Sequence, residues 1–427
     1  MSSLIPIVGA AQNYAWGKYG SKSAVAQFSH SNDPSVSIDE TKPYAELWMG
    51  THAKAPATLK DNRKKLLSDV IASDPSKYLG SKVLSQYPTT NGGLPFLFKV
   101  LSINKVLSIQ AHPDKSLGAK LHVADPSHYP DSNHKPEMAV AITDFEAFCG
   151  FKPLPEIDVL LQKIPEFYQL VGAEVAQTFH DKISSASRED GRRLLQSVFG
   201  KVMTASPETV AKYAKKMVAR TKSQPELFGP VLADLIQRLN SQFPDDVGLF
   251  CGCLMLNHCF LNPGEAMFLH AKEPHAYISG NIMECMATSD NVIRAGFTPK
   301  FKDVDTLVSC LTYTTNPVEE QKQKPEDFAR GTGDAKFALY NPPIDEFSVL
   351  QVKFEARTGL SAHIAGIHGP SIVIVTDGSG EIAVKGEKSQ KAEPGYIYFV
   401  APDVELSLSS SSSSSPFTLY RAFCELE

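Results

Sequence analysis

The sequence predicts a mainly β protein that contains an inserted block of α-helices. From about residue 1 to 150, short apolar or alternating runs are broken by Pro, Gly, Asn and Asp, which is typical of β-strands. From about 153 to 246, apolar residues recur at helical spacing, and the β pattern then returns to the end of the chain. A chain of 427 residues is long enough for more than one domain.

Composition and charge exclude several classes of protein. With 42% hydrophobic and 21% charged residues, the chain has the composition of a globular protein. A net charge of -5 argues against general binding to nucleic acid or to an anionic membrane. The start of the sequence lacks the pattern of a secretory signal, and no apolar run has the length of a membrane span. We therefore expect a cytosolic monomer without nucleic-acid or membrane partners, in which any anionic substrate meets a local basic site.

The cysteines indicate a reducing compartment. They are odd in number and lie mostly within apolar runs, as expected of reduced thiols in a core. A zinc site formed by Cys251, Cys253, His258 and Cys259 is an alternative, but the spacing does not fit the usual finger or ribbon. We interpret these cysteines as buried apolar side chains. The seven are Cys149, Cys251, Cys253, Cys259, Cys285, Cys310 and Cys424.

The helical block contains a clear helix start. Ser206 followed by Pro207 supplies a capping hydroxyl and a proline suited to the first helical position. Three apolar groups at helical spacing predict three helices. These groups are Ile157, Leu160, Leu161 and Ile164; Val210, Tyr213, Ala214 and Met217; and Leu232, Leu235, Ile236 and Leu239.

The β region contains an internal repeat. NPGEAMFLHAKEPHAY (262–277) and EPGYIYFVAPDVELSL (393–408) share a Pro-Gly pair, a phenylalanine and a following turn in the same places. Without gaps, His275 falls on Leu406. The repeat predicts two related β units, of which the second lacks this histidine.

Two polar segments follow the first unit. The segment 321–334 is rich in turn residues and is interpreted as a linker. The run 409–415 consists of serine and ends at Pro416, which predicts a mobile loop between two late strands.

The segment LPFLFKVLSINKVLSIQAHPDK (94–115) alternates apolar and polar residues. Interpreted as one strand, it places Ser108, Gln110 and His112 on one face and Ile109 on the other. A polar stripe of this kind faces something other than a hydrophobic core.

Two further polar positions complete a possible metal site. In NHKPEMAVAI (133–142), Lys135 and Glu137 share a face of the predicted strand, and His275 follows a proline in EPHAYISGN. With Gln110 and His112, these residues offer two imidazoles, one carboxylate and one amide oxygen, which suit Zn²⁺. Because only the carboxylate is charged, the ion would remain a strong Lewis acid. Nine other histidines are interpreted as ordinary polar residues: His30, His52, His122, His128, His180, His258, His270, His363 and His368.

Motifs along the whole chain resemble those of the type I phosphomannose isomerases. The matching stretches are YAWGKYG, AELWMGTHAKAPA, LPFLFKVLSINKVLSIQAHPDK, HKPEMAVAI and GNIMECMATSDNVIRAGFTPKFKDV. The resemblance implies two cupin-type, jelly-roll β barrels with an inserted helical domain. It also implies one Zn²⁺ per chain and interconversion of mannose 6-phosphate and fructose 6-phosphate, a step that supplies mannose for GDP-mannose and glycosylation.

The resemblance also assigns site residues. It places the zinc ligands at Gln110, His112, Glu137 and His275, and a catalytic arginine at Arg294. Other residues of the family's proposed active site fall on Lys99, Lys135 and Asp290.

The isomerisation requires a base and a group that stabilises negative charge on an enediol. A guanidinium suits oxyanions but is a poor proton acceptor. We therefore assign charge stabilisation to Arg294 and the proton transfers to Asp290 and Lys135, with Glu284 as a further candidate.

Five residues are predicted to contact the substrate. Basic groups near the motifs would meet the phosphate, and aromatic rings would match the apolar faces of a sugar. The predicted contacts are Lys99, Ser108, Tyr277, Lys300 and Trp16; Lys115 is a further basic candidate.

The predicted domains are a catalytic β domain (1–152 and 247–320), a helical insertion (153–246) and a C-terminal β domain without a metal site (321–427). Two alternative functions remain at this point. A cupin iron oxygenase would use two histidines and one carboxylate, but it has no need for Gln110 as a ligand. A non-catalytic sugar-binding cupin has no need for Arg294.

Overall fold

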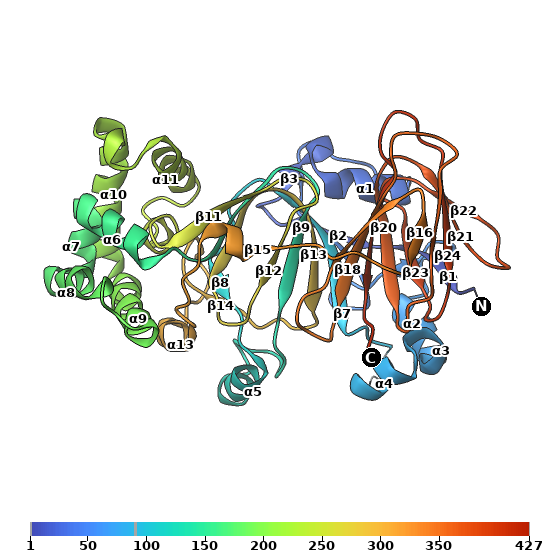
Figure 1. Cartoon of the computed structure of the whole chain (residues 1–427), viewed down its shortest axis with the longest axis horizontal. Helices are drawn as coiled ribbons and strands as arrows, with labels where there is room; N and C mark the ends of the chain where they lie inside the picture. Colours follow the sequence, from blue (N-terminus) through green and yellow to red (C-terminus); the bar gives the residue numbers. More distant parts are fainter. Residues whose placement is uncertain (1, 89–91, 427) are drawn as a thin grey trace.

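The computed structural model describes residues 2–88 and 92–426. The helical block lies at one end of an elongated molecule, and the sheets fill the middle and the opposite end, where both termini lie (Figure 1). The mainly β fold class with a helical insertion is confirmed. Among the described residues, the strand pairings form open sheets, and closure into a complete barrel is not seen.

The largest sheet carries the candidate site. Its main path runs β15-β12-β9-β13-β7-β5-β2, and β10, β11, β8 and β14 branch from it through β13. The strands are β2 (Ala10–Gln12), β5 (Glu46–Met49), β7 (Phe96–Ile103), β8 (Gln110–Ala111), β9 (Glu137–Ala141), β10 (Phe145–Phe151), β11 (Leu256–Leu261), β12 (Ala266–Leu269), β13 (His275–Ala287), β14 (Ile293–Arg294) and β15 (Lys322–Gln323).

The remaining strands form two further sheets and a separate pair. The seven-stranded sheet contains β1 (Leu4–Val8), β6 (Thr58–Leu59), β17 (Lys336–Tyr340), β18 (Ser348–Lys353), β20 (Ser371–Asp377), β23 (Ile397–Val400) and β25 (Thr418–Phe423). The five-stranded sheet contains β16 (Gly331–Gly333), β19 (Ser361–Ile364), β21 (Gly380–Val384), β22 (Gln390–Ala392) and β24 (Leu406–Ser410), and β3 (Lys18–Tyr19) pairs with β4 (Pro43–Tyr44). The N-terminal strand β1 therefore pairs with β23, far away in the sequence.

The faces of the sheets explain where the site lies. One face of the largest sheet packs against the seven-stranded sheet through a shared apolar core that includes Phe98, Met283 and Phe399. The opposite face carries buried polar side chains, including Lys99 and Glu284. Side chains alternate between faces along a strand, so the apolar positions anchor the sheet while the polar positions line its other face.

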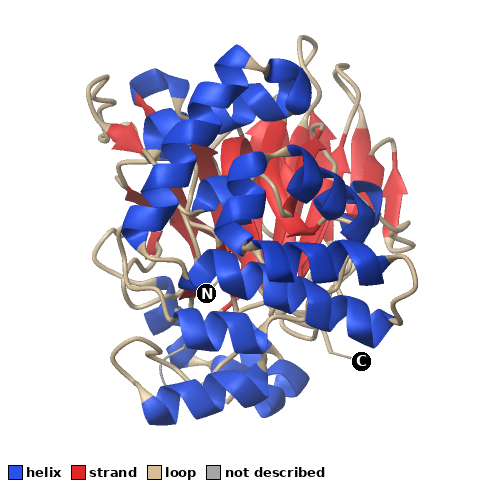
Figure 2. Cartoon of the chain, turned by 90° about the vertical axis from the view of Figure 1, so that its left-hand side faces the viewer, coloured by secondary structure: helices blue, strands red, loops and turns tan. Residues whose placement is uncertain are grey.

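The helical block confirms the predicted helical insertion, and three of its helices carry the predicted apolar groups, while the others were not predicted. Ser206 caps α10, where its Oγ accepts a hydrogen bond of 3.2 Å from the backbone N–H of Thr209. Figure 2 shows these helices covering one end of the sheets. Within the described residues, no helix is long and apolar enough to cross a membrane. The block comprises α6 (Leu154–Lys163), α7 (Pro165–Val171), α8 (Ala173–Ile183), α9 (Arg188–Thr204), α10 (Pro207–Ser223), η2 (Pro225–Leu227), α11 (Pro230–Gln242) and α12 (Gly248–Cys251).

The prediction of a β-rich segment before residue 150 missed several helices. Several short helices lie there, and some begin at capping residues such as Ser23 and Asp114. Their short apolar stripes are easily taken for strands. These helices are η1 (Gly20–Lys22), α1 (Ala24–Asn32), α2 (Leu67–Ser73), α3 (Pro75–Leu79), α4 (Ser81–Gln86) and α5 (Lys115–Ala124); α13 (Val304–Cys310) and η3 (Val318–Gln321) lie later in the chain.

The single strand predicted over 94–115 is also wrong, because a turn divides it. The strand β7 ends at Ile103, and the backbone N–H groups of Asn104 and Lys105 donate to the carbonyl of Trp16. The chain then returns as the short β8. Of the predicted polar stripe, only Gln110 lies within that strand.

The internal repeat is confirmed at the level of backbone geometry. Each copy contains a turn, a four-residue strand, a second turn and the start of another strand: β12 and β13 in one copy, β23 and β24 in the other. Gly264 and Gly395 have φ values of 88° and 92°. Lys272 and Asp403, which also match, have φ values of 62° and 63°. Such left-handed conformations are uncommon outside glycine, so their recurrence at matching positions indicates that the two units share a backbone structure.

Two segments predicted as irregular are partly ordered into strands. The predicted linker 321–334 contributes β15 and β16 to two different sheets. The serine run 409–415 begins inside β24, which ends at Ser410. All seven cysteines are free, and all except the half-buried Cys310 are buried.

Candidate metal centre and active site

Three of the four predicted metal ligands converge. The ligand atoms of His112, Glu137 and His275 lie within 4.8 Å of one another, and all three residues are buried. Glu137 Oε2 is 3.3 Å from His112 Nε2 and 3.4 Å from His275 Nε2. A carboxylate oxygen and two ring nitrogens therefore face a common point.

The backbone orients both imidazoles toward that point. His112 Nδ1 lies 2.8 Å from the carbonyl oxygen of Asn291, and His275 Nδ1 lies 3.1 Å from that of Glu273. A ring that donates through Nδ1 presents an unprotonated Nε2, as metal-binding histidines do. Burial lowers the pKa of His112 to about 4, so this ring is neutral at physiological pH.

The converging atoms fit a metal ion. His112 Nε2, His275 Nε2 and Glu137 Oε2 are buried and have no hydrogen-bond partner among the described residues. Leaving three such atoms unpaired is costly, and a shared divalent cation would satisfy all of them. Two imidazoles and a carboxylate suit Zn²⁺.

Strand register places Gln110 and Arg294 beside this group. Gln110 on β8 lies directly opposite His275 on β13 and, on its other side, opposite Arg294 on β14. Directly opposed residues in antiparallel strands project from the same face. Gln110 therefore lies on the same face as His275, with Arg294 one strand further out.

Arg294 is half-buried. Its guanidinium forms no hydrogen bond or ion pair among residues 2–88 and 92–426, and burial lowers its pKa. It is therefore free to bind an anion.

Lys135 lies at the candidate metal group. Its Nζ is 3.1 Å from Glu137 Oε1, the carboxylate oxygen that does not face the histidines. The predicted strand over 133–142 begins only at Glu137, so Lys135 lies before it and meets Glu137 by direct contact rather than as a neighbour on a strand face. One carboxylate oxygen of Glu137 thus faces the two histidines, and the other contacts the Lys135 ammonium group.

A loop between β13 and β14 is held by Asp131, which the sequence interpretation missed. Its carboxylate accepts hydrogen bonds of 2.8 Å from Ser289 Oγ and from the backbone N–H of Asp290. The side chain of Asn291 donates to the Asp131 carbonyl at 2.7 Å. Since the carbonyl of Asn291 orients His112, Asp131 supports the metal group indirectly.

A buried ion cluster lies behind the site. Lys99 Nζ is 3.3 Å from Glu46 Oε2 and 3.2 Å from Glu284 Oε2, while Trp48 Nε1 donates to Glu46 at 2.5 Å. Burial lowers the pKa of Lys99, but the two carboxylates outweigh this and raise it above its ordinary value. Glu284 is therefore held by a lysine, in agreement with a structural carboxylate. Glu46 and Trp48 were not predicted, although both lie in the quoted motif AELWMGTHAKAPA.

Asp290 lies in a more open cluster. Its carboxylate is 2.6 Å from Lys54 Nζ and 3.8 Å from His52 Nε2. Burial raises the pKa of Asp290, but Lys54 and His52 outweigh that effect and lower it. Asp290 is therefore ionised at neutral pH. The interpretation of His52 as an ordinary polar residue missed this proximity.

The remaining residues predicted to contact the substrate differ in burial and in their partners. Tyr277 is buried, with its ring centroid 6.4 Å from that of His275. Trp16 is half-buried and stacks on Tyr14 at 5.9 Å, and Ser108 is half-buried just before β8. Lys300 is exposed. Lys115 is occupied by an ion pair of 3.1 Å with Glu346.

Family models match most of the chain. Those described as phosphomannose isomerase type I match as the catalytic domain (residues 4–154), the helical insertion domain (170–256) and the C-terminal domain (338–387). The chain belongs to this family.

Relatives and solved structures of phosphomannose isomerases align with nearly the whole chain. Mannose-6-phosphate isomerase of Ogataea parapolymorpha is 60% identical, covering 99% of this chain and 98% of the relative. That of Saccharomyces cerevisiae is 56% identical, covering 97% of each. A Salmonella typhimurium structure bound to fructose 6-phosphate and zinc has a TM-score of 0.82 and 29% identity, covering 100% of both chains.

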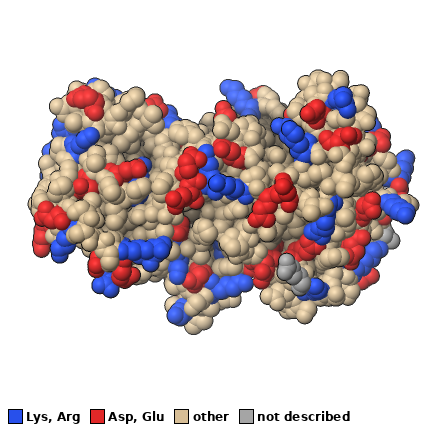
Figure 3. Space-filling view, viewed as in Figure 1, with Lys and Arg blue, Asp and Glu red and all other residues tan. Residues whose placement is uncertain are grey.

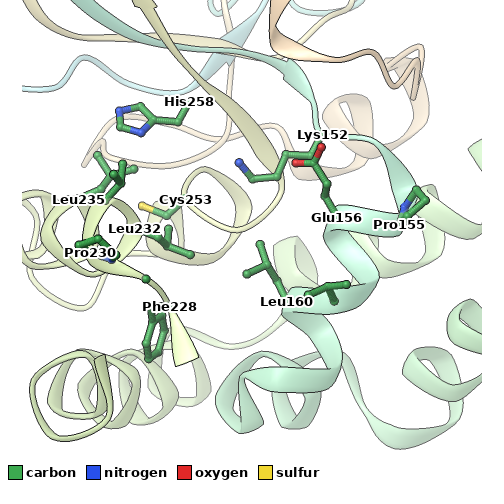
Figure 4. Close-up of a pocket in the computed structure, with 13 residues that line it drawn as sticks. Lys152, Pro155, Glu156, Leu160, Phe228, Pro230, Leu232, Leu235, Cys253 and His258 are labelled. Atoms are coloured by element: carbon green, nitrogen blue, oxygen red, sulfur yellow. The ribbon is translucent and has the colours of Figure 1, made fainter. Parts of the chain in front are cut away.

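The phosphomannose isomerase fold of this chain also contains a separate apolar cavity of about 550 Å³. It lies between α6 and α11, and its wall includes Leu160, Leu232 and Leu235, with Lys152 as a basic exception (Figure 4). It shares no residue with the candidate metal group. This cavity is therefore separate from the candidate metal group.

Proposed function

We propose that this chain interconverts mannose 6-phosphate and fructose 6-phosphate at one Zn²⁺ held by Gln110, His112, Glu137 and His275. The observation that carries the proposal is the convergence of three buried, unpartnered ligand atoms from β9, β13 and the end of β8. The relatives named as mannose-6-phosphate isomerases and the neighbour bound to zinc and fructose 6-phosphate support it.

Bound zinc would supply a Lewis acid for the sugar oxygens at the reacting carbons. The residues around it would stabilise negative charge and transfer protons. Arg294 provides a fixed positive charge beside Gln110, where it stabilises negative charge on an enediol oxygen or holds the phosphate. Such a charge lowers the barrier because the intermediate binds it more strongly than the neutral carbonyl does.

The proton transfers are assigned to Asp290 and Lys135. Asp290 is the stronger candidate for the base, because its lowered pKa keeps it ionised at neutral pH. It takes the proton from the carbon next to the carbonyl and returns it to the neighbouring carbon. Lys135, next to Glu137, is positioned to donate to a developing oxyanion.

Substrate binding completes the proposal. Arg294 and Lys300 provide positive charge in a chain whose visible surface mixes acidic and basic groups (Figure 3). Lys99 would act on the substrate from the buried cluster, where Glu46 and Glu284 already share its charge. Trp16 and Tyr277 would pack against the sugar, and Ser108 would bind a hydroxyl. Lys300 is exposed, so it would contact the substrate only where the substrate reaches the protein surface.

We also propose the predicted domain division, with the catalytic β domain at 1–152 and 247–320, the helical insertion at 153–246 and a metal-free C-terminal domain at 321–427. The chain would act as a cytosolic monomer. Free, mostly buried cysteines support a reducing location. Light scattering after size-exclusion chromatography measures the molar mass in solution and tests whether the chain is a monomer.

The decisive assay follows isomerisation of mannose 6-phosphate by the purified chain, before and after chelation. Activity should disappear on chelation and return with Zn²⁺. If iron restores activity and oxygen is consumed, the chain is a cupin oxygenase and the proposal is wrong. If the zinc-loaded chain binds sugar phosphate without converting it, it is a binding protein.

A further inference from the structure

The repeat extends from two short segments to whole sheets. The pairing order β12-β9-β13-β7-β5 of the catalytic sheet recurs as β23-β20-β25-β18-β17 in the C-terminal sheet. The repeated segments align Phe268 with Phe399. The strand partners then match in the same order. In the first unit, Phe268 lies opposite Met138, which lies opposite Cys285. In the second unit, Phe399 lies opposite Ile372, which lies opposite Ala422.

The register identifies which C-terminal residues stand where the active-site residues stand in the first unit. Arg421 on β25 takes the place of Glu284, and Ser371 on β20 takes the place of Glu137. The shared face that carries a metal-binding carboxylate and an ion cluster in the first unit thus carries an arginine and a serine in the second.

Arg421 is buried without a partner. It is 0% exposed, and its Nε, Nη1 and Nη2 atoms lack hydrogen-bond partners among the described residues. The residues opposite it in the sheet, Leu350 and Val373, are apolar. A buried guanidinium without a hydrogen bond or counter-charge is strongly unfavourable, so this side chain requires a ligand.

Ser371 is the second unpartnered group on the same face. It is 0% exposed, and its Oγ lacks a hydrogen-bond partner among the described residues. Because Val373 lies opposite Arg421, Ser371 is the diagonal neighbour of Arg421, at a Cα separation of about 7–8 Å. A small acceptor between them could receive hydrogen bonds from both side chains.

The charges near Arg421 leave its positive charge uncompensated. Arg330 and Glu425 act on it electrostatically, but these two residues already form an ion pair with each other. Burial lowers the pKa of Arg421 to about 9, which leaves it protonated at neutral pH. The partner required by the geometry is therefore an anion.

We propose that the interior of the C-terminal unit binds a small inorganic monoanion, such as chloride, between the Arg421 guanidinium and the Ser371 hydroxyl. The two repeats then use the same position with opposite charge. In the first, carboxylates hold a cation; in the second, an arginine holds an anion. Arg421 and Ser371 are both 0% exposed and the residues opposite Arg421 are apolar, which favours a monatomic ion over a sugar phosphate.

Bromide soaking and thermal unfolding test the proposal on the full zinc-loaded chain. In bromide-soaked crystals, we expect an anomalous peak within hydrogen-bonding distance of the Arg421 guanidinium. Replacing gluconate by chloride at constant ionic strength should raise the unfolding midpoint of the wild type by about 2 °C or more. Arg421→Met should abolish that rise while leaving isomerase activity unchanged, and Arg330→Met should retain it.

Water at the guanidinium in bromide-soaked crystals would overturn the proposal. A bromide peak with no effect of chloride on the wild-type midpoint would mean an adventitious ion only, which also overturns it. Should Arg421→Met fail to fold, the crystal and the wild-type midpoint together still decide. A chloride effect that persists in Arg421→Met would place the anion elsewhere and contradict the assignment.

Discussion

Arg294 lies directly opposite Gln110, one strand away from the candidate metal group. This pairing separates the arginine from the metal ligands while keeping it on their face of the sheet. Arg294→Ala should therefore retain zinc but lose about 10²–10³-fold in kcat, because a fixed charge near the developing oxyanion is removed. Zinc analysis and steady-state kinetics of the same preparation measure both effects. Arg193→Ala, at an exposed ion pair with Glu189, is the matched control. Full activity in Arg294→Ala contradicts the assigned role.

Asp131 is predicted to support the metal group from outside. Asp131→Ala removes the acceptor for Ser289 and Asp290 and loosens the loop whose Asn291 carbonyl orients His112. Zinc affinity should fall by about 10–100-fold, measured by competition with a chromophoric chelator. Asp334→Ala, which loses a comparable hydrogen bond to the Ser361 backbone, should leave the affinity unchanged. Equal affinities in the two variants would show that Asp131 has no positioning role.

The buried cluster behind the site predicts a large stability effect. Lys99→Met leaves Glu46 and Glu284 buried without their shared cation, which should cost about 3–5 kcal/mol in the free energy of unfolding. Arg193→Met breaks only an exposed pair and should change it by less than about 1 kcal/mol. Denaturant unfolding followed by tryptophan fluorescence compares them. Similar unfolding midpoints would mean that the cluster is not stabilised by Lys99.

Stability at acidic pH should depend on Glu146. Burial raises its pKa, but hydrogen bonds from His258 and Arg238 outweigh this and lower it from 4.5 to about 2. A carboxyl whose pKa is lowered on folding contributes stability above its unfolded pKa and loses that contribution as the pH falls through the folded value. Between about pH 4.5 and 2, wild-type stability should therefore fall more steeply than that of Glu146→Gln. Thermal midpoints across this range measure the slopes, and equal slopes would rule out the effect.

Several features of the fold and site follow from local sequence patterns. Ser206 and Pro207 mark a helix start, and the polar residues Glu137 and His275 stand at the first positions of the otherwise mostly apolar strands β9 and β13. Such signals depend on residues within a few positions of one another.

Other features depend on contacts that the local pattern does not contain. The meeting of Lys99 with Glu46 and Glu284 depends on the register of three strands. The pairing of β1 with β23 joins the two ends of the chain. Asp131 acts from a loop whose shape is set by Asn291 and Ser289, so no periodic pattern marks it.

Zinc content of single-ligand variants tests the central assignment most directly. Mass spectrometry of the metal should find one zinc per wild-type chain and a near-complete loss in His275→Ala, with isomerisation lost in parallel. His363→Ala, at an exposed histidine of the C-terminal part, should keep both. A His275→Ala chain that is folded and still holds one zinc would contradict the account.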